Sequence, residues 1–245
     1  MTDSEPTVPT PEKASLAEDF VDIFFSPSAV FARRANSGFF LVMCVLTLLL
    51  GGLFLVNRGA MQGIMDAEFA RSMAAAAKQN PGMTEEQIAM AKKFAGYATS
   101  FGAFIGIPLA ILFTGLGVWL TGKLFEARLG YTAATTIAAY SFMPRVIEAF
   151  AVNAQGWMID TDALTGRFQL SLGVGRFLDP GMNAGVLGLV GRLDLFTLWV
   201  TVLLAIGIGV VGKLPREKVV LAGVTMWTIG ALPALWTLVS TAIKG

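Results

Sequence analysis

The run GFFLVMCVLTLLLGGLFLV, residues 38–56, contains no charged side chain and decides the fold class. A transmembrane helix needs about 20 consecutive, mostly apolar residues, because the bilayer core offers no partners for backbone polar groups. The chain is 55% hydrophobic and only 14% charged, with a mean hydropathy of +0.66. Three further charge-free runs are found at 98–121, 195–212 and 219–241. The sequence therefore predicts an all-α integral membrane protein.

A fifth run, 132–154, is apolar except for two charged residues. Counting it gives five transmembrane helices in a membrane domain over 38–243, with the two termini on opposite sides of the membrane. Basic residues such as Arg33, Arg34 and Lys123 lie close to the span ends on one side. Lysine and arginine in short connections favour the cytoplasmic side. We therefore expect a multi-pass membrane protein with the N-terminus in the cytoplasm and the C-terminus outside.

The composition excludes several classes of function. The chain has no histidine, which excludes histidine-dependent catalytic triads, the usual zinc sites and histidine proton relays. A formal net charge of +1 gives no indication of nucleic-acid binding. The sequence shows no phosphate loop, serine elbow or metal-binding pattern. We expect a non-enzymatic protein with no catalytic residues, no cofactor and no metal.

The segment before the first span divides into two parts. Residues 1–14 are polar and contain several prolines, which is typical of a disordered tail. Residues 15–37 indicate two short amphipathic helices on the cytoplasmic side, separated at Ser26 and Pro27, because serine caps helices and proline suits their first position. We expect these helices either to pack on the spans or to sense a partner or lipid.

The two connections on the opposite side of the membrane are expected to differ. In the first, Thr84 with Gln87 three positions later gives a capping-box pattern, which predicts a helical hairpin. In the second, residues 160–178, apolar and polar side chains alternate from Phe168 to Leu172. Such alternation is typical of a β-strand. We therefore expect a small β-hairpin in the second connection.

The fifth run holds a candidate intramembrane polar site made of Tyr140, Pro144, Arg145 and Glu148. Arg145 and Glu148 are three residues apart, so they share a helix face and can form an ion pair within one turn. An arginine at the bilayer centre costs about 3 kcal/mol on insertion scales, and a carboxylate partner reduces that cost. Pro144 lacks an N–H and frees the carbonyl of Tyr140 as a further acceptor. Three interpretations remain: a structural clamp, the lining of a polar cavity for lipid headgroups or small solutes, or an ion-coupling site of a transporter.

Four other residues point to helix ends and helix packing. Asp194 precedes the run 195–212, where it predicts an N-cap, and Trp199 lies one turn further on, at the depth of the aromatic belt. Gly102 and Gly106 form a GxxxG motif, which lets helices approach closely within one chain or between two copies.

Three segments, taken in order, resemble the Ypt-interacting-protein (Yip) domain family in its bacterial branch. They are FFSPSAVFARRANSG at 24–38, ARLGYTAATTIAAYSFMPRVI at 127–147 and RLDLFTLWVTVLLAIGIGVVGKLPREKVV at 192–220. The resemblance implies a polytopic protein of a bacterial inner (cytoplasmic) membrane with a cytoplasmic N-terminus. In eukaryotes it implies a trafficking or membrane-organising role. The Asp-Leu-Tyr-Gly-Pro motif of eukaryotic members does not precede the first span here. Binding of a Rab-type GTPase is therefore not expected.

The expected function is a membrane-organising or interaction scaffold. Its partners would be the lipid bilayer and, through Gly102 and Gly106, other membrane proteins or a second copy of the chain. The alternative is a lipid or small-solute transporter that uses the polar site at Arg145 and Glu148. A hydrated cavity open to the membrane would favour transport, and a tightly packed, fully bonded pair would favour the scaffold.

Overall fold

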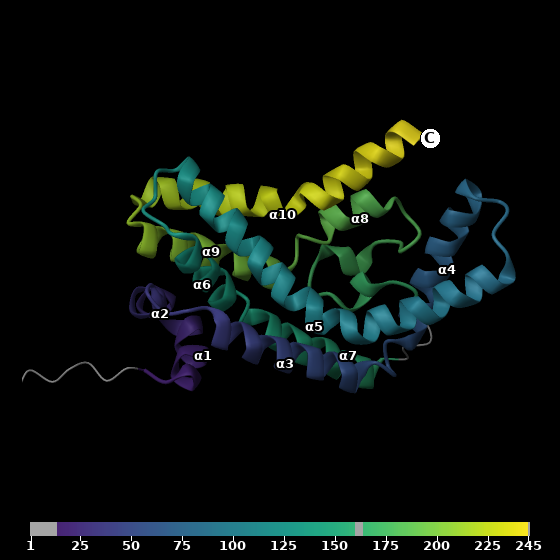
Figure 1. The fold of residues 1–245 in the computed structure, drawn as a ribbon, viewed down its shortest axis with the longest axis horizontal. Coiled ribbons are helices and arrows are strands. Elements are labelled where there is room, and N and C mark those ends of the chain that lie inside the picture. Colours follow the sequence, from purple (N-terminus) through teal and green to yellow (C-terminus); the bar gives the residue numbers. More distant parts are fainter. Residues whose placement is uncertain (1–13, 160–163, 245) are drawn as a thin grey trace, which may run out of the picture.

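The computed structural model describes residues 14–159 and 164–244, which form a bundle of helices (Figure 1). The predicted tail, 1–14, lies outside the described residues except for residue 14. No β-strand occurs in the described ranges, so the all-α prediction is confirmed. In chain order the elements are α1 (Leu16–Phe25), α2 (Pro27–Arg34), α3 (Phe40–Asn57), α4 (Gln62–Gln79), α5 (Glu85–Leu124), α6 (Tyr131–Ser141), α7 (Pro144–Met158), the 3-10 helices η2 (Arg167–Leu170) and η3 (Val174–Phe177), α8 (Ala184–Val190), α9 (Leu195–Gly212) and α10 (Arg216–Lys244).

Four helices in the described part of the chain are long and apolar enough to cross a membrane. They comprise Phe40–Asn57 in α3, Phe101–Leu124 in α5, Leu195–Gly212 in α9 and Arg216–Ile243 in α10. Large apolar side chains such as Leu48, Phe113 and Val202 are exposed on them. Exposed apolar faces of this kind suit contact with acyl chains. The chain is accordingly a multi-pass membrane protein.

The span predicted over 132–154 is not one continuous helix, so the prediction of five unbroken spanning helices is corrected to four such candidates in the described residues. Its residues form α6 and α7, separated by a turn at Phe142 and Met143. Pro144 occupies the first position of α7. A backbone N–H at that position makes no hydrogen bond within the helix, so proline is tolerated there. The carbonyl of Tyr140 accepts a hydrogen bond from the N–H of Met143 at 3.2 Å. The prediction failed because it treated the proline as a kink inside one helix, whereas the proline begins a second helix.

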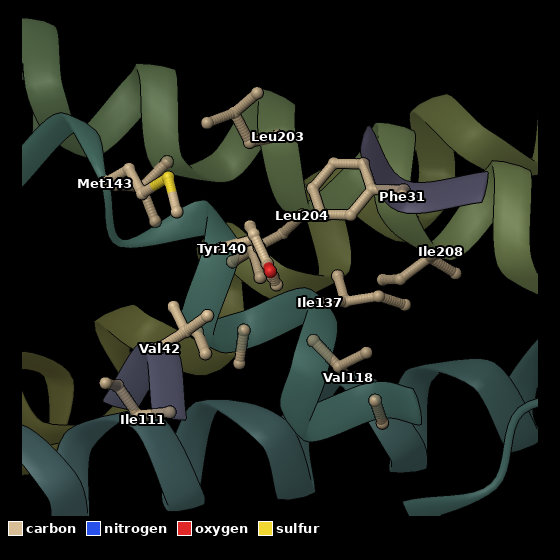
Figure 2. Close-up of a cluster of buried hydrophobic side chains, with 14 of the residues drawn as sticks. Phe31, Val42, Ile111, Val118, Ile137, Tyr140, Met143, Leu203, Leu204 and Ile208 are labelled. Atoms are coloured by element: carbon tan, nitrogen blue, oxygen red, sulfur yellow. The ribbon is translucent and has the colours of Figure 1, made fainter. Parts of the chain in front are cut away.

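Helix α6 lies at the centre of the bundle. All residues at 134–141 are buried, so this stretch has no side facing lipid. Its neighbours approach closely, because a Cβ added at Gly115 of α5 would overlap Thr135 and one at Gly207 of α9 would overlap Ile137. Figure 2 shows Ile137 among apolar side chains from α2, α3, α5 and α9. Small residues in the neighbouring spans therefore make room for a fully enclosed helix.

The α1–α2 pair packs on α9, and a buried carboxylate holds it in place. The side chain of Asp19 has no exposed surface. Arg33 donates to its Oδ1 from Nε at 2.7 Å, and Arg34 donates to its Oδ2 at 2.6 Å. The hydroxyl of Tyr140 in α6 donates to the same Oδ2 at 3.2 Å. One carboxylate therefore joins α1, α2 and α6.

The connection between α3 and α5 is helical, as predicted. Helix α4 stands at a steep angle to the start of α5, and α5 extends well beyond its candidate membrane span (Figure 1). The Thr84 hydroxyl accepts from the N–H of Gln87 at 3.3 Å, and the Gln87 side chain accepts from the N–H of Thr84 at 3.0 Å. The predicted capping box is therefore present at the start of α5.

The β-hairpin predicted over 160–178 is wrong for the described part, and residues 160–163 lie outside the described residues. The chain forms η2 and η3 there. Leu170 is 1% exposed and Leu172 is 41% exposed, whereas a strand would place both on one face. The side-chain oxygen of Gln169 accepts hydrogen bonds from two backbone N–H groups just before η2. Such local side-chain bonds offer the backbone an alternative to a ladder between strands, and the alternation of side chains does not reveal them.

The start of α9 contains the predicted cap and a contact with α1. The carboxylate of Asp194 accepts from the N–H groups of Phe196 at 2.9 Å and Thr197 at 3.3 Å. The ring of Trp199 meets the ring of Phe24 edge-on, with 5.3 Å between their centroids. The first turns of α9 thus help to hold the N-terminal pair of helices.

Gly102 and Gly106 of α5 leave open space beside them in the part of the chain that the structure describes. A Cβ added at either position would meet no described atom within 4 Å. Their use in self-association stays a prediction.

We expect Asp19→Ala to lower the free energy of unfolding by about 2–4 kcal/mol, because two arginines lose a shared, buried acceptor. The matched control is Asp22→Ala. The Asp22 carboxylate is 42% exposed and contacts Arg33 alone, so its loss should cost about 1 kcal/mol or less. Thermal unfolding of the purified protein in detergent measures both changes. Equal losses in the two variants would contradict the role given to Asp19.

Candidate intramembrane polar site

Arg145 and Glu148 form the ion pair expected from their spacing. Nη1 of Arg145 donates to Oε2 of Glu148 at 2.5 Å, and Nη2 donates to the Thr197 hydroxyl of α9 at 3.1 Å. The two charged side chains are 29% and 25% exposed. Because Pro144 begins α7, both charges lie near a helix N-terminus, which favours Glu148 and disfavours an unpaired Arg145. The arginine is therefore held by both an acid and a hydroxyl.

A cavity of about 410 Å³ lies between α3, α5 and α7, and the ion pair borders it. The other lining residues are apolar except for Asn57 and Asn153. The Asn57 side chain is 3% exposed, and its Oδ1 has no partner among the described residues. Gly106 and Ala110 of α5 also line the cavity and are themselves exposed. The cavity is therefore open at these residues of α5, on a face that would contact acyl chains.

Two smaller cavities meet the same arginine from other directions. One, of about 220 Å³, is bordered by Arg145, Glu148 and Arg167. The other, of about 280 Å³, lies between α5, α9 and α10 and is bordered by Arg145 and Arg192. The Thr197 side chain borders both. The side chain of Arg145 thus stands between three cavities.

The structure separates Tyr140 from the other residues of the predicted polar site. Its hydroxyl is directed to Asp19, and its carbonyl is used by the turn after α6, so neither atom binds Arg145. Tyr140 belongs instead to the cluster formed by Asp19 with two arginines. Burial disfavours the charge of Arg33, but hydrogen bonds and charges of Asp22 and Asp19 outweigh this effect and raise its pKa above the usual value.

Sequence reasoning missed Asp19 and Arg192 as site residues. Asp19 is on the polar face of a short helix, where a carboxylate usually faces water, and its partner Tyr140 lies 121 positions away. The adjacent arginines at 33–34 could have indicated this cluster, because a short helical hairpin can bring them back to the acidic side chains of the preceding helix. Arg192 stands two positions before a helix cap, where nothing local marks it. Within the described residues no group of three or more acidic or cysteine side chains is placed to hold a metal ion.

Comparison with known proteins gives one positive result. A profile of the Yip1 domain matches residues 21–238, which extends from α1 into α10. A search of curated proteins found no match, and a search of solved structures found none either. Because the match covers far more than half of the chain, the protein belongs to the Yip1 domain family.

Proposed function

We propose that this Yip1-domain protein is a non-enzymatic, membrane-organising scaffold that binds a lipid molecule between α3, α5 and α7. The observation that carries the proposal is the lining of that cavity, which is an apolar wall with one ion pair at its edge. Small-molecule sites are commonly apolar concave surfaces with a few polar groups that fix orientation.

The chemistry of the cavity favours an uncharged or zwitterionic amphiphile. Its volume of about 410 Å³ falls within the usual range of ligand sites. Arg145 and Glu148 neutralise one another, so a ligand with a net charge would gain no compensating charge there. The Oδ1 of Asn57 is a buried acceptor without a partner among the described residues, and the O–H or N–H of a headgroup hydroxyl or amine could donate to it.

A second candidate function is lipid or small-solute transport. The observations in its favour are that the cavity between α3, α5 and α7 is open at α5 and that a second cavity also adjoins Arg145 and Glu148. A transporter would move a fluorescent lipid between the leaflets of reconstituted vesicles, and a scaffold would bind the lipid without moving it. Faster movement that is lost in a Glu148→Gln variant would favour transport over the scaffold.

The position of α6 and α7 supports a specific topology. They follow one another along α3 in the same direction (Figure 1). We infer that they cross the membrane together as a broken helix, which is tolerated where it is enclosed by protein. The protein would then have its N-terminus in the cytoplasm and its C-terminus outside, in a bacterial inner membrane.

Reporter fusions at the two ends test this topology. A reporter before residue 1 should be active as a cytoplasmic protein, and one after residue 245 as an external protein. Reporters on the same side of the membrane would show that α6 and α7 do not cross together.

Filling the cavity should remove the bound lipid. We expect Gly106→Leu, which lines the cavity, to lower lipid occupancy by about fivefold or more, because its side chain takes the space of the acyl chain. The matched control is Gly102→Leu, one turn earlier in α5 and outside the lining, and neither substitution meets an atom within 4 Å at its Cβ. Native mass spectrometry of the detergent-purified protein gives the occupancy. Equal occupancy in the two variants would refute the proposed site.

The ion pair should behave as one unit. We expect Glu148→Met to lower the free energy of unfolding by about 1–3 kcal/mol, since it leaves Arg145 with one hydroxyl partner. Replacing both residues by methionine should cost less than this single change, because no unpaired charge remains. The comparison uses thermal unfolding in one detergent. A double variant less stable than the single variant would show that the two residues do not act as a pair.

A further inference from the structure

Arg192 lies just before α9, and its positive charge is not neutralised by the described residues. Its Nη2 donates to the carbonyl of Trp227 in α10 at 2.9 Å, and its guanidinium lies 5.3 Å from the centroid of that ring. No carboxylate of the described part forms an ion pair with it within 4.0 Å. Its Nε is buried and has no hydrogen-bond partner there. A half-buried guanidinium with a buried, unused donor and no acidic partner is well placed to bind an anionic group.

The position of Arg192 is built into the bundle. A Cβ added at Gly230 of α10 would overlap the guanidinium, so the glycine makes room for it. The backbone carbonyl and the ring of Trp227 both contact the guanidinium of Arg192. The guanidinium is therefore fixed at the wall of a cavity, and it does not extend freely into solvent.

A second arginine borders the same cavity. The cavity of about 280 Å³ between α5, α9 and α10 is bordered by both Arg145 and Arg192, and also by Thr197. The positive charge of Arg145 is close enough to act on that of Arg192, which makes the two cations unfavourable neighbours unless an anion lies near them. Arginine nevertheless stays protonated in proteins, so the charge must be compensated in another way.

The nearby acids do not supply that compensation. Neither Glu148 nor Asp194 lines this cavity. Glu148 is engaged by Arg145, and the Oδ1 of Asp194 caps α9. The arginine end of the cavity is therefore positive, unlike the neutral edge of the cavity between α3, α5 and α7.

The rest of this cavity is mostly apolar. It is lined by large side chains from α5, α9 and α10, among them Phe113, Leu204, Met226 and Ile229. A cationic end and an apolar body together match a ligand with an anionic group and a hydrocarbon chain. Arginine binds phosphate through paired N–H donors, and a hydroxyl such as that of Thr197 adds a further hydrogen bond.

We propose that Arg192 and Arg145, together with the Thr197 hydroxyl, bind a phosphate group at the end of the cavity between α5, α9 and α10. The phosphate is carried by a phospholipid whose chain occupies the apolar part, or it is free in solution. This site is separate from the lipid site between α3, α5 and α7 and goes beyond the function proposed for that site, although Arg145 borders both cavities.

The test compares two phospholipids with identical chains, anionic phosphatidylglycerol and zwitterionic phosphatidylcholine. Each is titrated into the full-length protein in detergent and followed by native mass spectrometry. We expect one phosphatidylglycerol to bind about tenfold more tightly than phosphatidylcholine, because only the anionic lipid compensates the extra arginine. Arg192→Gln should abolish this preference, and Arg192→Lys should keep part of it, since lysine retains the charge but loses the paired donors.

The matched control is Arg216→Gln, which removes one exposed positive charge at the start of α10. It should leave the preference unchanged. A second arm adds inorganic phosphate to lipid-depleted protein and measures the melting temperature. Stabilisation by phosphate that is lost in Arg192→Gln, without any preference for the anionic lipid, identifies free phosphate as the ligand of the site.

Three results would overturn the proposal. The first is that the wild-type protein neither prefers the anionic lipid nor responds to phosphate. The second is that Arg192→Gln, melting within a few degrees of the wild type, behaves as the wild type does. The third is that Arg216→Gln loses as much preference as Arg192→Gln. Because Gly106→Leu fills the other cavity and should keep the anionic preference, this site and the proposed lipid site can fail independently.

Discussion

The buried carboxylate of Asp19 fixes the arrangement on which the rest of the structure depends. An isolated carboxylate without water is strongly unfavourable, so Asp19 remains buried only while Arg33, Arg34 and Tyr140 supply donors. Tyr140 stands two positions before the turn that ends α6 and starts α7. By fixing the end of α6, the carboxylate also sets the place where α7 begins, and hence the position of Arg145.

The two proposed ligand sites differ because of how charge is distributed around the first turn of α9. Thr197 receives a hydrogen bond from Arg145, whose charge Glu148 already balances, while Arg192 nearby has no ion-pair partner among the described residues. Two cavities that share one arginine therefore differ in net charge. In an environment of low dielectric such a difference is large enough to separate neutral from anionic ligands, even when their hydrocarbon parts are alike.

Features that depend on neighbours in sequence could be predicted from the sequence. Charge-free runs give the four candidate spans, the three-residue spacing gives the Arg145–Glu148 pair, and the capping patterns give the starts of α5 and α9. Each of these is decided within a few turns of one helix, where composition and period are direct consequences of helix geometry.

Features that depend on tertiary contacts could not be predicted in the same way. The alternation at Phe168–Leu172 matched a strand, but Gln169 binds the backbone locally and gives a 3-10 turn. The run 132–154 is apolar enough to span a membrane, but it is enclosed by protein and does not need to be one uninterrupted helix. The roles of Asp19 and Arg192 depend on Tyr140, Trp227 and Gly230, which their own surroundings in the sequence do not indicate.

The distance between Asp19 and Tyr140 along the chain also sets an order of events during synthesis. The two residues are 121 positions apart, so at about 5–20 residues per second the ribosome needs about 6–24 seconds to reach the second after the first. Before Tyr140 is synthesised, Asp19 can pair with Arg33 and Arg34, but α1 and α2 cannot yet pack on α6 or α9. Although α1 and α2 are synthesised first, they can therefore dock only after α6 and α9 have been made.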